Sequence, residues 1–463
     1  LPAWSTVSII EPSHFDAGTC FFAAHRYRLD DTHPYIYRTT DYGLTWTLIT
    51  NGLPANVYSR CVREDPNRKN LLYAGTETGA YISFNNGDTW QSMQLNLPVT
   101  PVHDMQVKKD LKDLVIATHG RGFWVIDDLT PLYQISDSVA NAEYWLYQPN
   151  VAIRMDGKQL DPAKEETIQR QAGTNAPNGV IVDYYLKQKP TGEIKLVFFS
   201  SDGDSIIAFS NKYDKYGELI KKKGNFFEDS IHKEDILPAD IGMNRFVWNA
   251  IYPDAKHFEE EYWSAGSLAG PKALPGNYSV KLMKGDTLLM KRNFSIVLNP
   301  KVKTSQEDLK AQFDLMMDVN KKQNEIIKTI LQIRGVQSQV NNFVNSFSDS
   351  TKISSLKKIA KPLLDSLQII GDTLINSKIK ANEDDLRYPM QLFERYCSLQ
   401  DFIRSADARP TEQEHMVFEE LNARLAPELR RLKKVFDTQI PAFNNAVKQL
   451  NLDVVDPGRV IKD

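Results

Sequence analysis

Short segments in which apolar and polar residues alternate fill the chain up to about residue 130, a pattern typical of β-strands with one buried face. The segments recur in the same order in three consecutive units, each opened by a Leu-Pro dipeptide. The spacing is 52 residues from Leu1 to Leu53 and 44 from Leu53 to Leu97. The predicted first strands are 7–11, 59–64 and 102–107, the second strands 19–25, 71–76 and 113–119, and the later third strands 80–83 and 123–126. An insertion at 26–33 accounts for the longer first unit.

Two of the units contain related octapeptides at 39–46 and 83–90, each ending in Gly-x-Thr-Trp. A repeat of roughly 40–50 residues made of short strands predicts the blades of a β-propeller. Within the octapeptide we expect the polar side chain to accept backbone N–H bonds across a turn, the glycine to supply a positive φ, and the tryptophan to be buried between strands. These residues, assigned a structural role, are Asp41, Gly43, Trp46, Asn85, Gly87 and Trp90.

The third unit ends after 123–126 without an octapeptide. A closed propeller typically has about four to eight blades, so three units do not close a ring. We therefore expect 1–134 to form the last three blades of an incomplete propeller. Its partners are upstream blades of a longer protein, which also supply the missing outer strand of the third unit.

A second all-β region is predicted over 135–300, with an insertion at 211–240. Its predicted strands are 180–186, 193–200, 205–209, 242–249, 277–284 and 287–298. The Asp202-Gly203 and Gly285-Asp286 dipeptides mark hairpin turns. Trp248 and Tyr278 are interpreted as core or corner aromatics.

From 301 to 463 the apolar spacing becomes helical. Capping boxes at 304–307 and 411–414 predict two helix starts, Pro362 a kink or restart, and Pro441 a stop. A shorter helix is expected over 385–404. The pattern predicts four helices in an antiparallel bundle that supports the assembly rather than catalysis. The fold class is thus multidomain, β then α: a partial propeller, a β-sandwich and a helical bundle.

The octapeptide resembles the Asp-box of the bacterial neuraminidase repeat and of sortilin-type propellers. The second region resembles the immunoglobulin-type domain of the flagellar hook-capping family, and Thr118 to Trp124 extends the likeness. Together these features are similar to the C-terminal half of bacterial envelope proteins described as sortilin-like or neuraminidase-repeat glycosyl hydrolases. The resemblance implies an extracytoplasmic location, whether periplasmic, cell-surface or secreted, and a peptide or glycan ligand.

Composition narrows the functional classes. The 56 basic and 59 acidic residues nearly cancel, which gives no electrostatic basis for binding nucleic acid. No apolar run approaches the roughly 20 residues of a transmembrane helix. The three cysteines, interpreted as buried thiols, have neither disulfide nor metal-site spacing, so we expect no metal and no cofactor.

A glycosidase needs two carboxylates roughly 5–10 Å apart across the scissile bond. A gap-free alignment of the first strands places Ser8, Arg60 and Asp104 at equivalent positions. Asp104 is a weak catalytic candidate, and an ion pair with Arg60 is the favoured interpretation. Further candidates for ligand binding are Glu77, His103, His119 and Arg121.

Two functions remain open at this stage. The favoured one is a ligand-binding propeller for a peptide, protein or oligosaccharide, acting as a scaffold in a larger envelope assembly. The alternative is a glycoside hydrolase that acts on a polysaccharide, with its catalytic carboxylates mostly in upstream blades.

Overall fold

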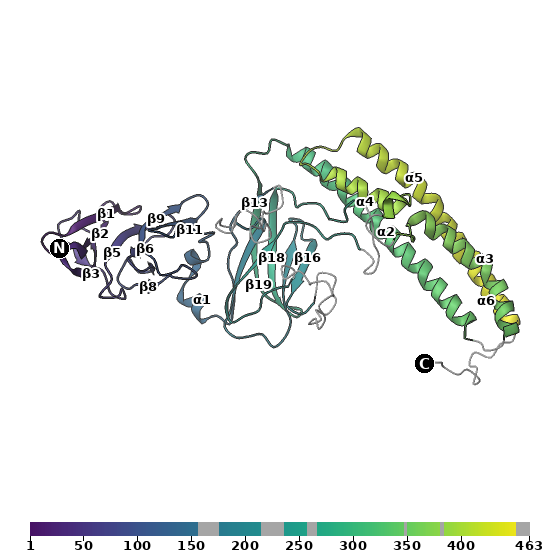
Figure 1. The fold of residues 1–463 in the computed structure, drawn as a ribbon, viewed down its shortest axis with the longest axis horizontal. Coiled ribbons are helices and arrows are strands. Elements are labelled where there is room, and N and C mark those ends of the chain that lie inside the picture. Colours follow the sequence, from purple (N-terminus) through teal and green to yellow (C-terminus); the bar gives the residue numbers. More distant parts are fainter. Residues whose placement is uncertain (156–175, 214–235, 257–265, 347–349, 380–383, 451–463) are drawn as a thin grey trace.

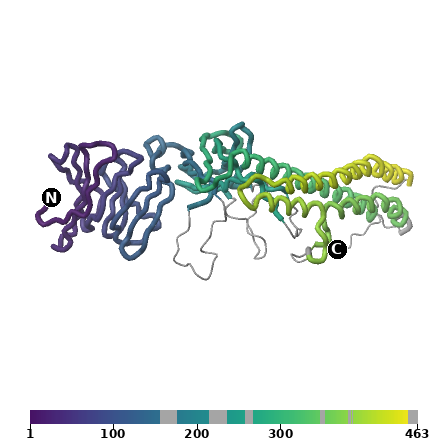
Figure 2. The backbone as a smooth tube through the Cα atoms, turned by 90° about the horizontal axis from the view of Figure 1, so that it is seen from above, coloured from purple at the N-terminus to yellow at the C-terminus, as the bar shows by residue number. Residues whose placement is uncertain are grey.

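The computed structural model describes residues 1–155, 176–213, 236–256, 266–346, 350–379 and 384–450. Figures 1 and 2 show an elongated molecule with small β-sheets at the N-terminal end, a pair of larger sheets in the middle and long helices at the other end. No described helix combines the length and apolarity that crossing a membrane requires.

Three antiparallel sheets, here called blades 1, 2 and 3, follow one another along the chain. Blade 1 contains β1 (Thr6–Pro12), β2 (Cys20–Arg26), β3 (Asp31–Thr39) and β4 (Thr47–Leu48). Blade 2 contains β5 (Ser59–Glu64), β6 (Leu72–Thr76), β7 (Ala80–Ser83) and β8 (Gln91–Ser92). Blade 3 contains β9 (Val102–Lys108), β10 (Asp113–Thr118) and β11 (Phe123–Ile126). Each predicted strand of the three units lies within a residue or two of an observed one.

The blades pack face to face, and two apolar clusters fill the spaces between them. The first strands form the inner edge of the stack, where β5 contacts both β1 and β9. In the described residues β11 pairs only with β10, so blade 3 has no fourth strand. The arrangement is compatible with part of a β-propeller.

The middle of the molecule is a two-sheet region with one shared core. One sheet contains β12 (Tyr144–Leu146), β14 (Val180–Leu186) and β17 (Gly242–Trp248). The other contains β13 (Ala152–Arg154), β15 (Ile194–Phe199), β16 (Ser205–Ser210), β18 (Gly276–Lys284) and β19 (Thr287–Leu298). Most of the predicted insertion lies outside the described residues. Trp248 is fully buried, and the Tyr278 hydroxyl donates to the Leu274 carbonyl at 2.8 Å, so both aromatics belong to the core.

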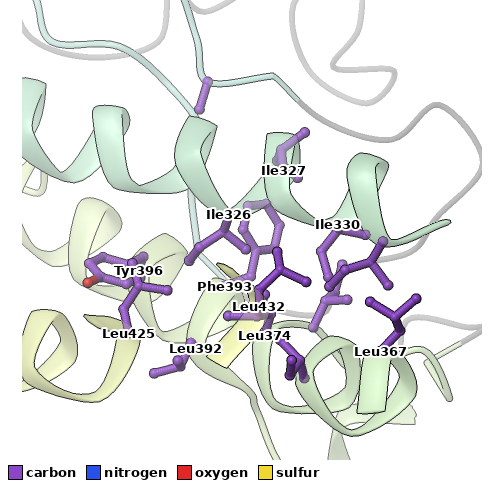
Figure 3. Close-up of a cluster of buried hydrophobic side chains, with 14 of the residues drawn as sticks. Ile326, Ile327, Ile330, Leu367, Leu374, Leu392, Phe393, Tyr396, Leu425 and Leu432 are labelled. Carbon is purple, nitrogen blue, oxygen red and sulfur yellow. The ribbon is translucent and has the colours of Figure 1, made fainter. Parts of the chain in front are cut away.

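The helical region contains α2 (Gln306–Val344), α3 (Ser350–Leu374), α4 (Leu392–Ile403), α5 (Glu412–Lys434) and α6 (Ile440–Gln449). Side chains from these helices meet in one apolar cluster, part of which Figure 3 shows. The predicted apolar stripes are therefore buried against one another.

Several helix boundaries differ from the prediction. The N-cap of α2 is Ser305, whose hydroxyl accepts the Asp308 N–H, instead of Thr304. The helix α4 begins at Leu392, well after 385, where the Glu394 carboxylate accepts the Gln391 N–H at 2.9 Å. The Thr411 capping box is present as predicted.

Neither predicted proline break occurs. The helix α3 continues through Pro362, which is exposed, so that the backbone carbonyl it leaves unpaired can be hydrated. Instead of stopping near Pro441, α5 continues through a five-residue π-helix (Val435–Gln439) into α6. The wider turn accommodates a proline that cannot donate the usual backbone bond.

Candidate ligand-binding site

The first strand of every blade has a register irregularity at the same place. The pairing skips one residue in each strand, and these residues are Ser8, Arg60 and His103. A β-bulge re-aims the side chain of the extra residue. The gap-free alignment was therefore wrong by one position in blade 3: His103, not Asp104, is equivalent to Arg60. Asp104 corresponds to Cys61, since their pairing partners Ala117 and Gly75 are equivalent.

Arg60 is the centre of a polar and aromatic cluster at this end of the blades. Its Nε donates to Glu77 Oε2 at 2.9 Å, and its Nη2 lies 2.7 Å from the same oxygen. The Nη2 group also donates to the Tyr58 hydroxyl at 2.9 Å. Burial, followed by the hydrogen bond with Glu77, raises the pKa of Tyr58 to about 12, so this phenol stays protonated at neutral pH.

Blade 1 completes the cluster with aromatic rings. Tyr27 stacks on Tyr58 with 4.8 Å between ring centroids, and the Arg60 guanidinium lies 5.2 Å from the Tyr27 ring and 4.8 Å from the Tyr58 ring. Such contacts hold a guanidinium in a fixed plane. His25 lies against both tyrosines. The sequence analysis missed these three aromatic residues.

The signal that could have located Tyr27 was the insertion at 26–33. This insertion lies in the connection between second and third strands, and its 3-10 turn carries Tyr27. The corresponding connections of blades 2 and 3 carry Glu77 and His119, which were both predicted as candidates.

Blade 3 contributes a pair of histidines. His103 and His119 stack with 5.1 Å between ring centroids. Burial, the nearby Arg60 and His119 all lower the pKa of His103. Arg121 lies in the same connection as His119, is exposed, and forms no ion pair within the described part of the chain. Five of the predicted residues therefore gather at one end of blades 2 and 3, and one of them, Arg121, leaves its charge available to a ligand.

Asp104 belongs to a different cluster, further along the first strands. Its carboxylate accepts from Arg63, with the Nη2 group 2.8 Å from Oδ1 and 3.1 Å from Oδ2. The Arg63 Nη1 group donates to Glu11 Oε2 at 2.7 Å, so one guanidinium joins all three blades. The predicted ion pair of Asp104 exists, but its partner is Arg63 and not Arg60. The sequence analysis did not identify Arg63 or Glu11.

The carboxylates on the inner edge are thus held by arginines. Glu11 and Asp104 share Arg63, and Glu77 is bound to Arg60. A general acid needs a carboxyl group that carries a proton at working pH, and a nearby guanidinium favours the ionised form instead. Among the described residues no group of three His, Cys, Asp or Glu side chains could hold a metal ion.

The octapeptides lie away from this cluster and form tight turns. Asp41 Oδ1 accepts the Thr45 N–H at 2.9 Å, and Asn85 Oδ1 accepts the Thr89 N–H at 3.0 Å. Gly43 and Gly87 have φ values of +87° and +89°. The expectation that both tryptophans are buried was wrong for Trp46, which is 41% exposed, whereas Trp90 is 4% exposed.

No family model matches the chain, and no curated protein matches it. The solved structures that resemble it include YCF48 bound to D1 peptide, at 15% identity and a TM-score of 0.21 over 27% of this chain and 38% of that chain. An ancestral GH74 enzyme matches at 17% identity and a TM-score of 0.23 over 46% and 28% of the two chains. The GH74 enzyme of Niastella koreensis matches at 12% identity and a TM-score of 0.23 over 61% and 38%. The chain spans less than two fifths of each of these structures, and the site is assigned from its own geometry.

Proposed function

We propose that this protein is a ligand-binding propeller protein whose ligand contacts the cluster around Arg60. The observation that carries the proposal is the arrangement of Arg60 between two tyrosine rings and a carboxylate, at a bulge that recurs in all three blades. Preorganised aromatic and guanidinium groups are typical of binding surfaces, because little side-chain entropy is lost when a partner arrives.

The charges at this end of the blades favour a ligand that carries a carboxylate. Arg28 and Arg121 are exposed there, and Glu77 is already neutralised by Arg60. The Arg28 guanidinium lies 5.0 Å from the Tyr27 ring centroid, so the aromatic surface is bordered by a second cation. An acidic side chain, a peptide C-terminus or a uronic acid offers the planar anion that a guanidinium binds with two hydrogen bonds.

The hydrolase alternative has less support in these blades. Asp104 is bound on both oxygens by Arg63, so it does not offer the protonated carboxyl group that cleavage of a glycosidic bond requires. The octapeptide resemblance supports an extracytoplasmic location for the binding function. The two-sheet and helical regions would then hold the blades within a larger envelope assembly.

The test uses arrays of acidic peptides and uronic-acid oligosaccharides, with amidated or neutral counterparts, followed by calorimetric titration of the full chain with the best binder. We expect acidic members to be retained selectively and Arg60→Gln to weaken binding at least tenfold. Arg38→Gln is the matched control, because Arg38 pairs with Asp88 near the octapeptide of blade 2, away from the cluster.

Equal affinity of the Arg60→Gln variant would contradict the proposed site. Release of reducing sugar from a polysaccharide, abolished by Asp104→Asn, would show that the hydrolase alternative is correct.

A further inference from the structure

The contact between blades 1 and 2 shows what a blade of this repeat needs on its neighbour. Blade 2 presents a mostly apolar face containing Val62, Leu72, Ala74 and Trp90 to blade 1. The Trp90 Nε1 group donates to the Ile49 carbonyl at 2.8 Å, and the Trp90 backbone N–H donates to the Asn51 carbonyl at 2.9 Å. The Ile49 side chain packs so closely on Gly87 that a Cβ there would lie 2.4 Å from its Cδ1.

The same positions of blade 1 form its opposite, free face. The strand registers pair Ile10 with Phe22 and Phe22 with Tyr37, as they pair Val62 with Ala74 and Ala74 with Tyr81. The free face therefore consists of Ile10, Cys20, Phe22, Tyr37 and Trp46, the counterparts of Val62, Leu72, Ala74, Tyr81 and Trp90.

These counterparts differ sharply in exposure. Ile10 is 64% exposed where Val62 is fully buried, and Trp46 is 41% exposed where Trp90 is 4% exposed. The free face is nevertheless ordered: Phe22 stacks on Tyr37 and meets the edge of Trp46, with 4.8 Å between the Phe22 and Trp46 centroids. The five residues line one groove, which also includes Gly43.

The polar group of Trp46 is satisfied differently from that of Trp90. Its Nε1 group donates to the Gly43 carbonyl within its own turn, at 3.1 Å, instead of to a neighbouring blade. The nearest atoms to a Cβ on Gly43 belong to Trp46 itself, at 3.8 Å, so the site where Ile49 packs on Gly87 is open here.

We propose that the free face of blade 1 is a docking surface for a further four-stranded blade of the same repeat. The occupant supplies an aliphatic side chain over Gly43 and, directly after its fourth strand, a backbone carbonyl for the Trp46 indole. Because Phe22 is larger than Ala74, the occupant carries a smaller residue opposite it than blade 1 offers to blade 2. This inference does not depend on the ligand proposed above.

A second copy of this chain is a poor occupant. Ile49 and Asn51 follow the fourth strand of blade 1, whereas the described residues of blade 3 contain no fourth strand. The free face of blade 3 also presents Asp104 and Gln106 at the positions where blade 2 has Cys61 and Arg63. An acidic residue in place of a buried thiol does not suit an apolar partner.

The experiment fuses residues 1–52 to Leu1 of the full chain, which recreates the native Gly52 to Leu-Pro junction found at Leu53. The added blade carries Phe21→Ala to make room for Phe22. Both the native chain and the fusion are labelled with fluorotryptophan, and Trp46→Phe identifies the resonance of the docking surface. We expect this resonance to lose its accessibility to a soluble paramagnetic probe in the fusion. A fusion whose added blade also carries Ile49→Asp, the control, should leave it accessible.

An added blade that folds but leaves Trp46 accessible would overturn the proposal. Sedimentation of the unfused chain provides the second measurement: we expect no association through this face. Concentration-dependent dimers that Trp46→Arg abolishes would show that a second copy, and not a repeat blade, is the occupant.

Discussion

The backbone at Gly266 passes so close to Cys397 that a Cβ at Gly266 would lie 2.0 Å from the Cys397 carbonyl carbon. Gly266 belongs to the two-sheet region, and Cys397 lies on α4. The next residue, Ser267, donates its backbone N–H to the Cys397 carbonyl at 2.8 Å. The Gln323 side chain of α2 donates to the Ser267 carbonyl at 2.9 Å. This segment therefore locks the two-sheet region onto the helices through backbone groups, at a place where only glycine fits.

Replacing Gly266 with alanine should destabilise this contact more than an ordinary left-handed glycine position would. Gly203 is the matched control: its φ is +89° against +82° for Gly266, but a Cβ there would meet nothing within 4 Å. The left-handed conformation alone costs an alanine about 1–2 kcal/mol. We expect Gly203→Ala to lose about that much in denaturant unfolding and Gly266→Ala to lose about 1–3 kcal/mol more through overpacking.

The Cys397 thiol reports the same effect locally. It is buried, and burial raises its pKa to about 12, so it reacts slowly with thiol reagents in the intact protein. In a background that carries Cys20→Ser, thiol labelling of Gly266→Ala should be faster than that of Gly203→Ala. Equal unfolding free energies and labelling rates for the two variants would show that the close contact does not constrain the interface.

Local features of the sequence predicted much of the secondary structure. The Thr411 capping box marks a helix start because the Thr411 hydroxyl and the Glu414 carboxylate need only each other's backbone N–H groups. The strand β5 was predicted at its observed bounds, since its alternating pattern is a property of the segment itself. The π-helix before Pro441 was not predictable in this way, because it depends on α5 and α6 packing on the same core.

The candidate site was predicted only in part, for a physical reason. Arg60 and Glu77 belong to one blade and were both identified, but Tyr27 reaches them from the neighbouring blade. The bulges at Arg60 and His103 change the register by one residue, which an alignment of strands without gaps does not detect. Burial of an octapeptide tryptophan likewise depends on what lies against its blade.

A buried ion pair makes a second link between the two-sheet and helical regions. Arg154 of β13 pairs with Asp407, in the connection between α4 and α5, and the two side chains are 5% and 8% exposed. The Arg154 Nε group also donates to the Ala273 carbonyl at 3.1 Å. Because Arg154→Met leaves the Asp407 carboxylate buried without its partner, we expect a loss of about 3–5 kcal/mol in unfolding free energy.

The double variant Arg154→Met with Asp407→Leu is the control, because it removes both charges. We expect it to recover most of the stability that the single variant loses, so that the two substitutions are strongly non-additive. Additive losses measured by denaturant unfolding would mean that the two side chains do not interact in solution.

The turn at Asp41 should make a contribution to stability that depends on pH. Hydrogen bonds from the Thr45 side chain and backbone and from Thr39 lower the pKa of Asp41 to about 2. The contribution of Asp41 is therefore fully present above the carboxyl's usual pKa of about 3.9 and is lost as the pH falls through about 2.

Asp41→Asn provides the comparison, because Asn85 makes the equivalent bonds in blade 2 without a charge. At pH 7 we expect Asp41→Ala to lower the melting temperature and Asp41→Asn to retain most of it. Between pH 5 and pH 3 the difference between wild type and the Asn variant should shrink. A difference that stays constant over this range would mean that the carboxylate charge plays no part in the turn.

The histidines near Arg60 should make the blades less stable in mild acid. Burial, together with the positive charge of Arg60, lowers the pKa values of His25 and His103 below the ordinary value of 6.5. Arg28 acts on His25 in the same direction, whereas Glu77 raises both pKa values slightly. Below about pH 6.5 the unfolded chain therefore binds protons that the folded chain does not, and stability falls as the pH is lowered through this range. Above it, these two groups contribute no pH dependence.

Replacing Arg60 separates the charge effect from burial. In Arg60→Gln the pKa values of His25 and His103 should both rise toward 6.5, measured by the NMR titration of their ring protons, and the loss of stability between pH 7.5 and pH 5.5 should become smaller. His415→Gln is the control, because His415 is exposed on α5, outside the cluster, so its removal should leave both titrations unchanged. If the two histidines titrate in Arg60→Gln as they do in the wild type, the Arg60 guanidinium does not face them, and the geometry of the cluster in solution differs from the one described.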